Sequence, residues 1–222
     1  MTPRASRIEP EAGRRSHAER TAETRARVME AVVASIAEVG FQRTTAAEIT
    51  RRAGVSWGAV QHHFGGKDGV LEAVVSDSFD RFAARLSDVG LDGKDLEARV
   101  TLFVERAWEH FGSLRYRSTV EILLNHPGAE TDAWREMLRT WNGVWSRFFP
   151  TPQLSRREVV DLQIHAISLL AGLATVRALG EPAARWLGGP LRLLREGLLE
   201  HLEPHPVRRT RGDGPRRRRS SA

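Results

Sequence analysis

The stretch that most constrains the fold of this chain runs from Thr45 to Phe64, TAAEITRRAGVSWGAVQHHF. It predicts two short helices joined by a tight turn. Thr45 and Glu48 fit a capping box, in which the hydroxyl and the carboxylate each satisfy a backbone N–H left open at a helix start. Gly54 can adopt the left-handed conformation that ends this helix, and Ser56 is a natural N-cap for the second one.

The apolar residues of this stretch lie on one side of each helix. Ala46, Ile49 and Ala53 recur at helical spacing, Val55 is expected to be buried in the turn, and Val60 with Phe64 forms the apolar edge of the second helix. The outer face of the second helix is therefore small and polar. A helix that enters the DNA major groove needs such a face, because small residues permit close approach while amides and imidazoles reach base edges or phosphates. Spacing alone leaves an ordinary helical hairpin as the alternative.

At fixed offsets around this motif the sequence resembles the N-terminal domain of TetR/AcrR-type transcriptional regulators. The resemblance covers roughly Thr21 to Phe82, and it implies a dimeric, all-helical, ligand-responsive repressor. One departure is Gln61, where the family usually has a tyrosine that contacts phosphate. The residues that carry the resemblance are Gly40, Phe41, Thr44, Thr45, Ile49, Ala53, Gly54, Val55, Ser56, Gly58, His63, Phe64, Lys67 and Leu71.

The candidate DNA contacts follow the outer side of the motif and the start of the next helix. Lys67 would lie in the first turn of that helix, where open N–H groups and the ammonium can hold a phosphate together; a solvated surface lysine is the alternative. The predicted contacts are Thr45, Ala47, Arg51, Ser56, Trp57, Gly58, Ala59, Gln61, His62, His63 and Lys67.

The rest of the chain predicts further helices separated by Gly, Pro and Asp clusters, with no strand pattern and no internal repeat, so the expected class is all-α. We expect an N-terminal basic arm over 1–20, a DNA-binding domain over 21–82, a larger ligand-binding and dimerisation domain over 83–203, and a disordered tail over 204–222. The expected helices are Ala18–Val39, one from Lys67 or Asp68, Asp95–Phe111, Ser113–Asn125, Glu130–Phe149, Ser155–Leu179 and Pro190–Glu203, with a short piece at Pro182–Leu187.

An aromatic stripe on the helix that ends at Phe149 indicates a ligand pocket in the larger domain. Its tryptophans recur at steps of three and four residues, which places large apolar surfaces on one side of the helix. Pockets for small molecules are lined in this way, with a few polar groups; a plain hydrophobic core is the alternative. The predicted lining is Trp108, His110, Phe111, Tyr116, Trp134, Trp141, Asn142, Trp145 and His165.

The last two long helices predict a dimer interface. Their apolar faces are too broad for one packing partner, and a second copy could pair with them in a four-helix arrangement. A large monomeric core is the alternative. The predicted interface residues are Leu162, Ala166, Leu169, Leu173, Val176, Leu191, Leu194 and Leu198.

The formal net charge of +6 and the pI near 10.9 favour a nucleic-acid partner less than they first suggest. Between 204 and 222 there are seven arginines and one aspartate, which leaves +6 in the tail alone. Such a tail can add salt-sensitive, sequence-independent affinity for DNA, or it can simply solubilise the end of the chain.

Several functions find no support in the sequence. The chain has no cysteine, which excludes disulfides and thiolate metal sites. It shows no phosphate-binding glycine loop, no G-x-S-x-G elbow and no histidine pair at metal spacing, so we expect no enzyme, no metal and no cofactor. Without a signal peptide or a run of 18 apolar residues, the expected location is the cytoplasm, with no membrane partner.

The sequence therefore predicts a homodimeric repressor that binds a palindromic double-stranded DNA operator and is released by a small apolar or amphipathic inducer. The alternatives are a helical ligand-binding or interaction protein without specific DNA reading, and a non-specific DNA binder that uses the arginine-rich tail.

Overall fold

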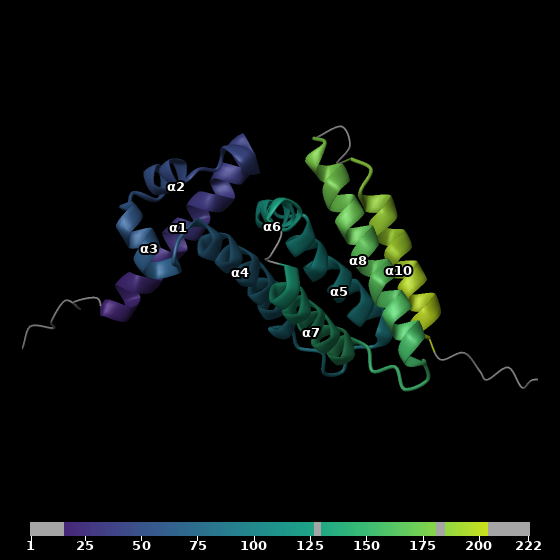
Figure 1. Ribbon diagram of the computed structural model, residues 1–222. Helices are drawn as coiled ribbons and strands as arrows, with labels where there is room; N and C mark the ends of the chain where they lie inside the picture. The colour runs from purple at the N-terminus through teal and green to yellow at the C-terminus, as the bar shows by residue number, and fades with distance from the viewer. Residues whose placement is uncertain (1–15, 127–129, 181–184, 204–222) are drawn as a thin grey trace, which may run out of the picture.

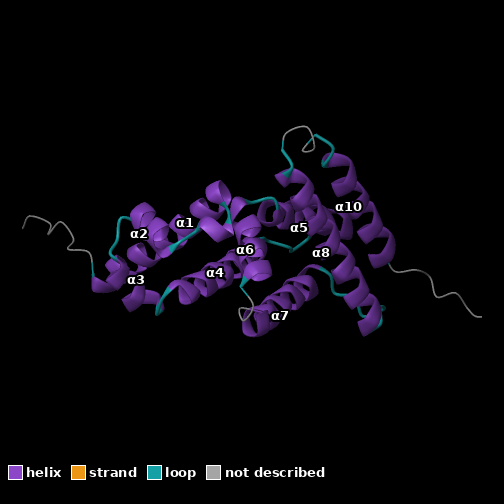
Figure 2. Ribbon diagram, turned by 45° about the horizontal axis from the view of Figure 1, so that its top comes forward, coloured by secondary structure: helices purple, strands orange, loops and turns teal. Residues whose placement is uncertain are grey.

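The computed structural model describes residues 16–126, 130–180 and 185–203, and this part of the chain is helical, with no strand (Figure 2). The predicted all-α class is confirmed. The elements are α1 His17–Val39, a short 3₁₀ turn η1 Phe41–Arg43, α2 Ala46–Ala53, α3 Trp57–Phe64, α4 Lys67–Ser87, α5 Leu96–Phe111, α6 Leu114–Asn125, α7 Glu130–Phe148, α8 Arg156–Ala178 and α10 Gly188–Leu202.

Side-chain caps fix where several helices begin. Ser16, Asp95, Ser113 and Ser155 each accept a hydrogen bond from the backbone N–H three residues later. The last three were expected to be the first residues of their helices and are caps instead. Because a cap satisfies an N–H from outside the helix, each helix begins one residue later than predicted.

Two differences lie near the C-terminal end. Helix α10 begins at Gly188, so Pro190 stands inside its first turn, where the missing N–H has no intrahelical partner to lose. The predicted short helix at Pro182–Leu187 lies partly outside the described residues, and 185–187 form a turn. The predicted break at Pro127-Gly128 also lies outside the described residues.

Two apolar cores divide along α4, which runs from the N-terminal head into the rest of the molecule (Figure 1). Val70 to Phe79 of α4 pack with α1, α2 and α3 in the head core. Phe82 and Leu86 pack with α5, α7, α8 and α10 in the second core. Ile122 of α6 is fully buried in the head core, although it lies more than 40 residues beyond the head in sequence. The two cores are therefore joined by α4 and by α6.

Helices α8 and α10 lie side by side at the end of the molecule far from the head (Figures 1 and 2). By length and composition alone α8 could cross a membrane, which departs from the expectation of no such segment. It packs against α5 and α10, as a core helix of a folded domain does. Only 22% of its most apolar stretch is buried in this chain, so a broad apolar surface remains on α8.

Candidate functional site

The motif folds as two short helices held by local caps. Thr45 accepts a hydrogen bond from the N–H of Glu48 at 3.2 Å, and Ser56 accepts one from the N–H of Ala59 at 3.2 Å. Gly54 has φ of +63°, a left-handed conformation that L side chains rarely adopt, and it ends α2 as the sequence suggested. These features turn α3 away from α2 within three residues.

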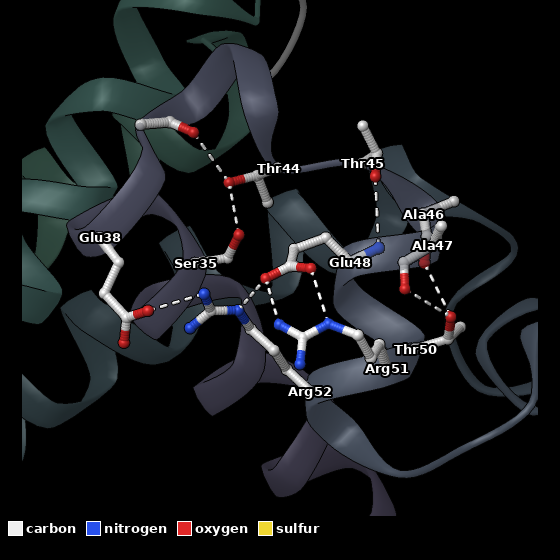
Figure 3. A network of polar contacts seen from close by, with 11 residues as sticks. Ser35, Glu38, Thr44, Thr45, Ala46, Ala47, Glu48, Thr50, Arg51 and Arg52 are labelled. Carbon is white, nitrogen blue, oxygen red and sulfur yellow. Dashed lines mark hydrogen bonds and ion pairs between the residues drawn. The ribbon is translucent and has the colours of Figure 1, made fainter.

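The predicted capping box is only half formed (Figure 3). The carboxylate of Glu48 does not return to the N–H of Thr45, which donates to the carbonyl of Arg43 at 2.9 Å. Glu48 instead accepts hydrogen bonds from Arg51, at 2.7 and 2.9 Å, and from Arg52. A charged guanidinium is a stronger partner for a carboxylate than a neutral N–H is, which explains why the second hydrogen bond of the capping box does not form.

The arginine contacts tie α2 to α1. The hydrogen bonds from Arg51 and then Arg52 lower the pKa of Glu48 to about 2. Arg52 also pairs with Glu38 of α1 at 2.7 Å, and this contact lowers the pKa of the Glu38 carboxyl. Beside this network the hydroxyls of Ser35 and Thr44, both buried, lie 2.9 Å apart. The motif is therefore held against its scaffold helix by polar contacts as well as by the core.

The structure places the predicted DNA contacts at the surface of the head. Ala59, His63 and Lys67 are half-buried, and Val55, which was expected to be buried, is half-buried as well because the turn lies at the rim of the head core. Arg51 is exposed over 67% of its side chain even though it pairs with Glu48. The exposed members of the set are Thr45, Ala47, Arg51, Ser56, Trp57, Gly58, Gln61 and His62.

Two contacts that the sequence did not indicate lie near the junction of α3 and α4, and the first holds the C-terminal end of α3. Arg25 of α1 donates to the carbonyl of His63 and its guanidinium lies 4.3 Å from the ring centre of Phe64. The ammonium of Lys67 lies 5.4 Å from the ring centre of Phe41. A cation over an aromatic ring is held by the ring's negative face. Nothing in the spacing of Arg25 signals this role, because its partner lies 38 residues away.

The second domain contains an apolar cavity of about 300 Å³ between α4, α5, α6, α7 and α8. The predicted residues His110, Phe111, Tyr116 and Trp141 meet in its wall. Burial, and to a smaller extent the charge of Arg85, lowers the pKa of His110 to about 4; burial also raises the pKa of Tyr116 to about 12. The remaining wall residues, which the sequence did not single out, are Phe79, Phe82, Thr119, Val120, Leu123, Leu124, Ile167 and Ala171.

Among the other predicted pocket residues, those whose side chains the structure describes do not line this cavity. Trp145 and Asn142 border a shallow depression on α7 and α8, and His165 borders a third hollow between α8 and α10. Trp108 is half-buried, with the guanidinium of Arg177 at 5.9 Å from its ring centre. The side chain of Trp134 lies outside the described residues. A step of three or four residues places side chains on one stripe, but the stripe is wide enough to face both core and cavity.

The predicted dimer residues are divided between this chain's own core and its partly covered surface, and the dimer interface stays a prediction. Ala166, Leu173, Leu194 and Leu198 are buried, and Leu162, Leu169, Val176 and Leu191 are half-buried. The exposed apolar residues of α8 and α10 are Val160, Ile164 and Leu193, at 40%, 56% and 62% exposure. Both helices also pack against α5.

A head of two capped helices with an exposed polar second helix, joined by one continuous helix to a domain with an apolar cavity, defines a DNA-binding regulator of the helix-turn-helix class. Comparisons with known proteins give its family. The family described as "Bacterial regulatory proteins, tetR family" matches residues 28–74. The head therefore contains the DNA-binding domain of the TetR family, and the comparisons support a TetR-type transcriptional regulator.

Curated relatives are transcriptional regulators, and solved structures share the fold. The HTH-type transcriptional regulator BetI of Burkholderia lata is 29% identical over 175 residues, covering 78% of this chain and 79% of that protein. A BetI 2 regulator of Chromohalobacter salexigens is 30% identical over 62% of this chain and 58% of its own. In fold, the chain resembles the fatty acid degradation regulator FadR from Bacillus halodurans, with a TM-score of 0.63 and 16% identity over 84% of this chain and 98% of that one.

Proposed function

We propose that this regulator is a homodimeric repressor of a palindromic operator, acting in the cytoplasm without catalytic activity, and that a small apolar or amphipathic ligand releases it from DNA. The observation that carries the proposal is the course of α4. It begins at Lys67, directly after the reading helix α3, and it carries Phe79 and Phe82 into the wall of the cavity. A ligand in the cavity therefore contacts the helix that holds the reading head.

Helix α6 supplies a second link between cavity and head. Thr119 and Leu123 line the cavity, whereas Ile122 is buried in the head core. Ser118 donates to the carbonyl of Val33 on α1 at 3.2 Å, and Arg115 pairs with Glu30 of α1 and with Asp77 of α4. For the ligand to release the protein from DNA, it must bind more tightly to the conformation whose heads do not fit the operator than to the conformation whose heads do.

The exposed face of α8 and α10 supports the proposed dimer. Val160, Ile164 and Leu193 lie exposed on it, and Gly172 adds no side chain that would hold a partner helix away. A twofold dimer would present two α3 helices to half-sites centred about one DNA turn apart. Pairing of this face with the same face of a second copy would cover the surface that α8 leaves uncovered.

The experiment that tests the function is the selection of bound sequences from a random double-stranded DNA pool, repeated at raised salt. A specific reader yields a palindromic consensus that survives the higher salt. Binding that is unselective and lost with salt would contradict the proposal, because it would come from phosphate contacts alone. Removal of Pro204 and all residues after it distinguishes the contribution of the tail from that of the head. The consensus should remain, because the head reads it.

Substitutions on α3 test which residues read the operator. Gln61→Ala and His62→Ala should each weaken binding by about 1–3 kcal/mol at particular base pairs if the side chain contacts a base, and more evenly if it contacts phosphate. Asn142→Ala removes an exposed amide from α7 and is the matched control. Equal effects of all three changes would show that α3 is not the reading helix.

A further inference from the structure

The chemistry of the cavity wall restricts the ligand that it can accept. The lining that the structure describes consists of aromatic and aliphatic side chains with four polar groups, and none of these described residues carries an acidic or basic side chain other than His110. The hydroxyl proton of Thr119 is already used, because it is donated to the carbonyl of Arg115 at 2.9 Å, so Thr119 is not a free donor. His110, Tyr116 and Trp141 are the polar groups left for a ligand.

Trp141 carries a buried donor without an acceptor. The residue is 3% exposed, and its indole Nε1 has no hydrogen-bond partner within the part of the chain that the structure describes. Its ring is held in place: it stacks on Phe82 with centres 5.5 Å apart and 11° between planes, and it meets Phe103 edge-on at 5.7 Å. A buried N–H without an acceptor costs free energy, and a ligand that supplies one recovers it.

The electrostatics of the wall disfavour a charged ligand of either sign. Among the side chains that the structure describes, no carboxylate lines the cavity to pair with a cation, and the positive charge of Arg85 acts on His110 from outside the wall. The described part of the wall likewise contains no lysine or arginine to pair with an anion. His110 cannot take that role at neutral pH, because its lowered pKa keeps the imidazole uncharged. Moving an unpaired charge from water into such a site is strongly unfavourable.

We propose that the inducer is a neutral, mainly aromatic or apolar molecule with an acceptor oxygen, such as a ketone or ester carbonyl, that takes a hydrogen bond from Nε1 of Trp141. At the close packing of protein interiors, a cavity of this volume holds about 10 to 15 non-hydrogen atoms. The neutral imidazole of His110 offers one donor and one acceptor beside it. This proposal rests on the proposed function, since it names the ligand of the same cavity.

The test compares two neutral probes that differ by one acceptor, benzophenone and diphenylmethane. Their dissociation constants are measured through displacement of 1-naphthylamine, a neutral fluorescent dye that is small enough for the cavity. We expect the wild-type protein to bind benzophenone about tenfold more tightly, which is the order expected for a buried hydrogen bond. Trp141→Phe should remove that preference, because it removes the N–H and keeps an aromatic ring.

Trp145→Phe is the matched control. Trp145 lies one helical turn further on, is 1% exposed and has the same unpartnered indole N–H, but it does not line the cavity. The preference for benzophenone should survive this change. Persistence of the preference in Trp141→Phe, or its loss in both variants, would overturn the hydrogen bond. Displacement of the dye by charged probes such as benzyltrimethylammonium or diphenylacetate, and by neither neutral probe, would overturn the ligand class.

A parallel titration of the selected operator keeps this proposal separate from the proposed function. If benzophenone binds with the expected preference and operator affinity stays constant, the ligand class holds and induction through this cavity fails. If a charged compound that displaces the dye releases the operator, induction holds and the ligand class fails.

Discussion

At the scale of single residues, Glu48 shows how a carboxylate binds the stronger of two kinds of donor within its reach. Its position three residues after Thr45 favours a bond back to the cap, but two guanidinium groups lie within reach and take the carboxylate instead. Through Arg52 the contact extends to Glu38 on α1. Glu48, which was expected to complete the cap at the start of α2, therefore helps to hold α2 against α1.

His110 makes a prediction about pH. Its pKa is about 4 in the folded protein against 6.5 for an ordinary histidine, so between these values the unfolded chain binds more protons than the folded one. His110 therefore leaves the free energy of unfolding unchanged above pH 6.5 and lowers it as the pH drops toward 4. We expect His110 to reduce the free energy of unfolding by about 2 kcal/mol at pH 5 relative to pH 7.5.

Urea unfolding of the wild-type protein and of His110→Phe at these two pH values measures this contribution. The variant keeps an aromatic ring and cannot titrate, so its loss of stability at pH 5 should be smaller by that amount. An equal loss in both proteins would mean that His110 is not the group responsible.

At the scale of elements, the junction between α3 and α4 depends on Gly69. A Cβ at this position would lie 1.9 Å from the carbonyl oxygen of Phe64, the last residue of α3. This oxygen belongs to the backbone and cannot move without moving α3. Only a glycine lets the first turn of α4 approach the end of α3 so closely.

Gly69→Ala should therefore lower the free energy of unfolding by about 1–3 kcal/mol and weaken operator binding at the same time. The control is Gly143→Ala on α7, where an added Cβ meets nothing within 4 Å. Alanine is the better helix former, so this change should raise stability by up to about 1 kcal/mol and leave DNA binding unchanged. Urea unfolding and operator titration of both variants measure the two effects. A Gly69→Ala protein with unchanged operator affinity would contradict the close approach.

At the scale of the whole molecule, the uncovered face of α8 bears on oligomeric state. Ile164 is 56% exposed near the middle of this helix, so Ile164→Glu should leave the monomer core intact while placing two like charges in the proposed interface. We expect sedimentation analysis to show a monomer and operator titration to show a loss of at least tenfold, because one head alone contacts one half-site.

The control for this change is Leu114→Glu, which places the same charge on the exposed start of α6, where Leu114 is 62% exposed. It should remain a dimer. If Ile164→Glu also remains a dimer with full operator affinity, the copies associate through another surface.

The sequence by itself determined the features that depend on residues a few positions apart. Helical spacing, the caps at Thr45 and Ser56 and the turn at Gly54 define the motif, because each arises within a single turn of chain. The all-α class and the family followed from the same local signals.

Tertiary structure decided which neighbour covers each face. Periodicity places Trp141 and Trp145 on one stripe, but only the packing of α4, α6 and α8 puts the first in the cavity wall and leaves the second outside it. In the same way, the burial of Ile122 in the head core and the contact of Arg25 with α3 depend on residues tens of positions away. A single sequence carries no spacing signal for such contacts, because they form only when separate helices pack together.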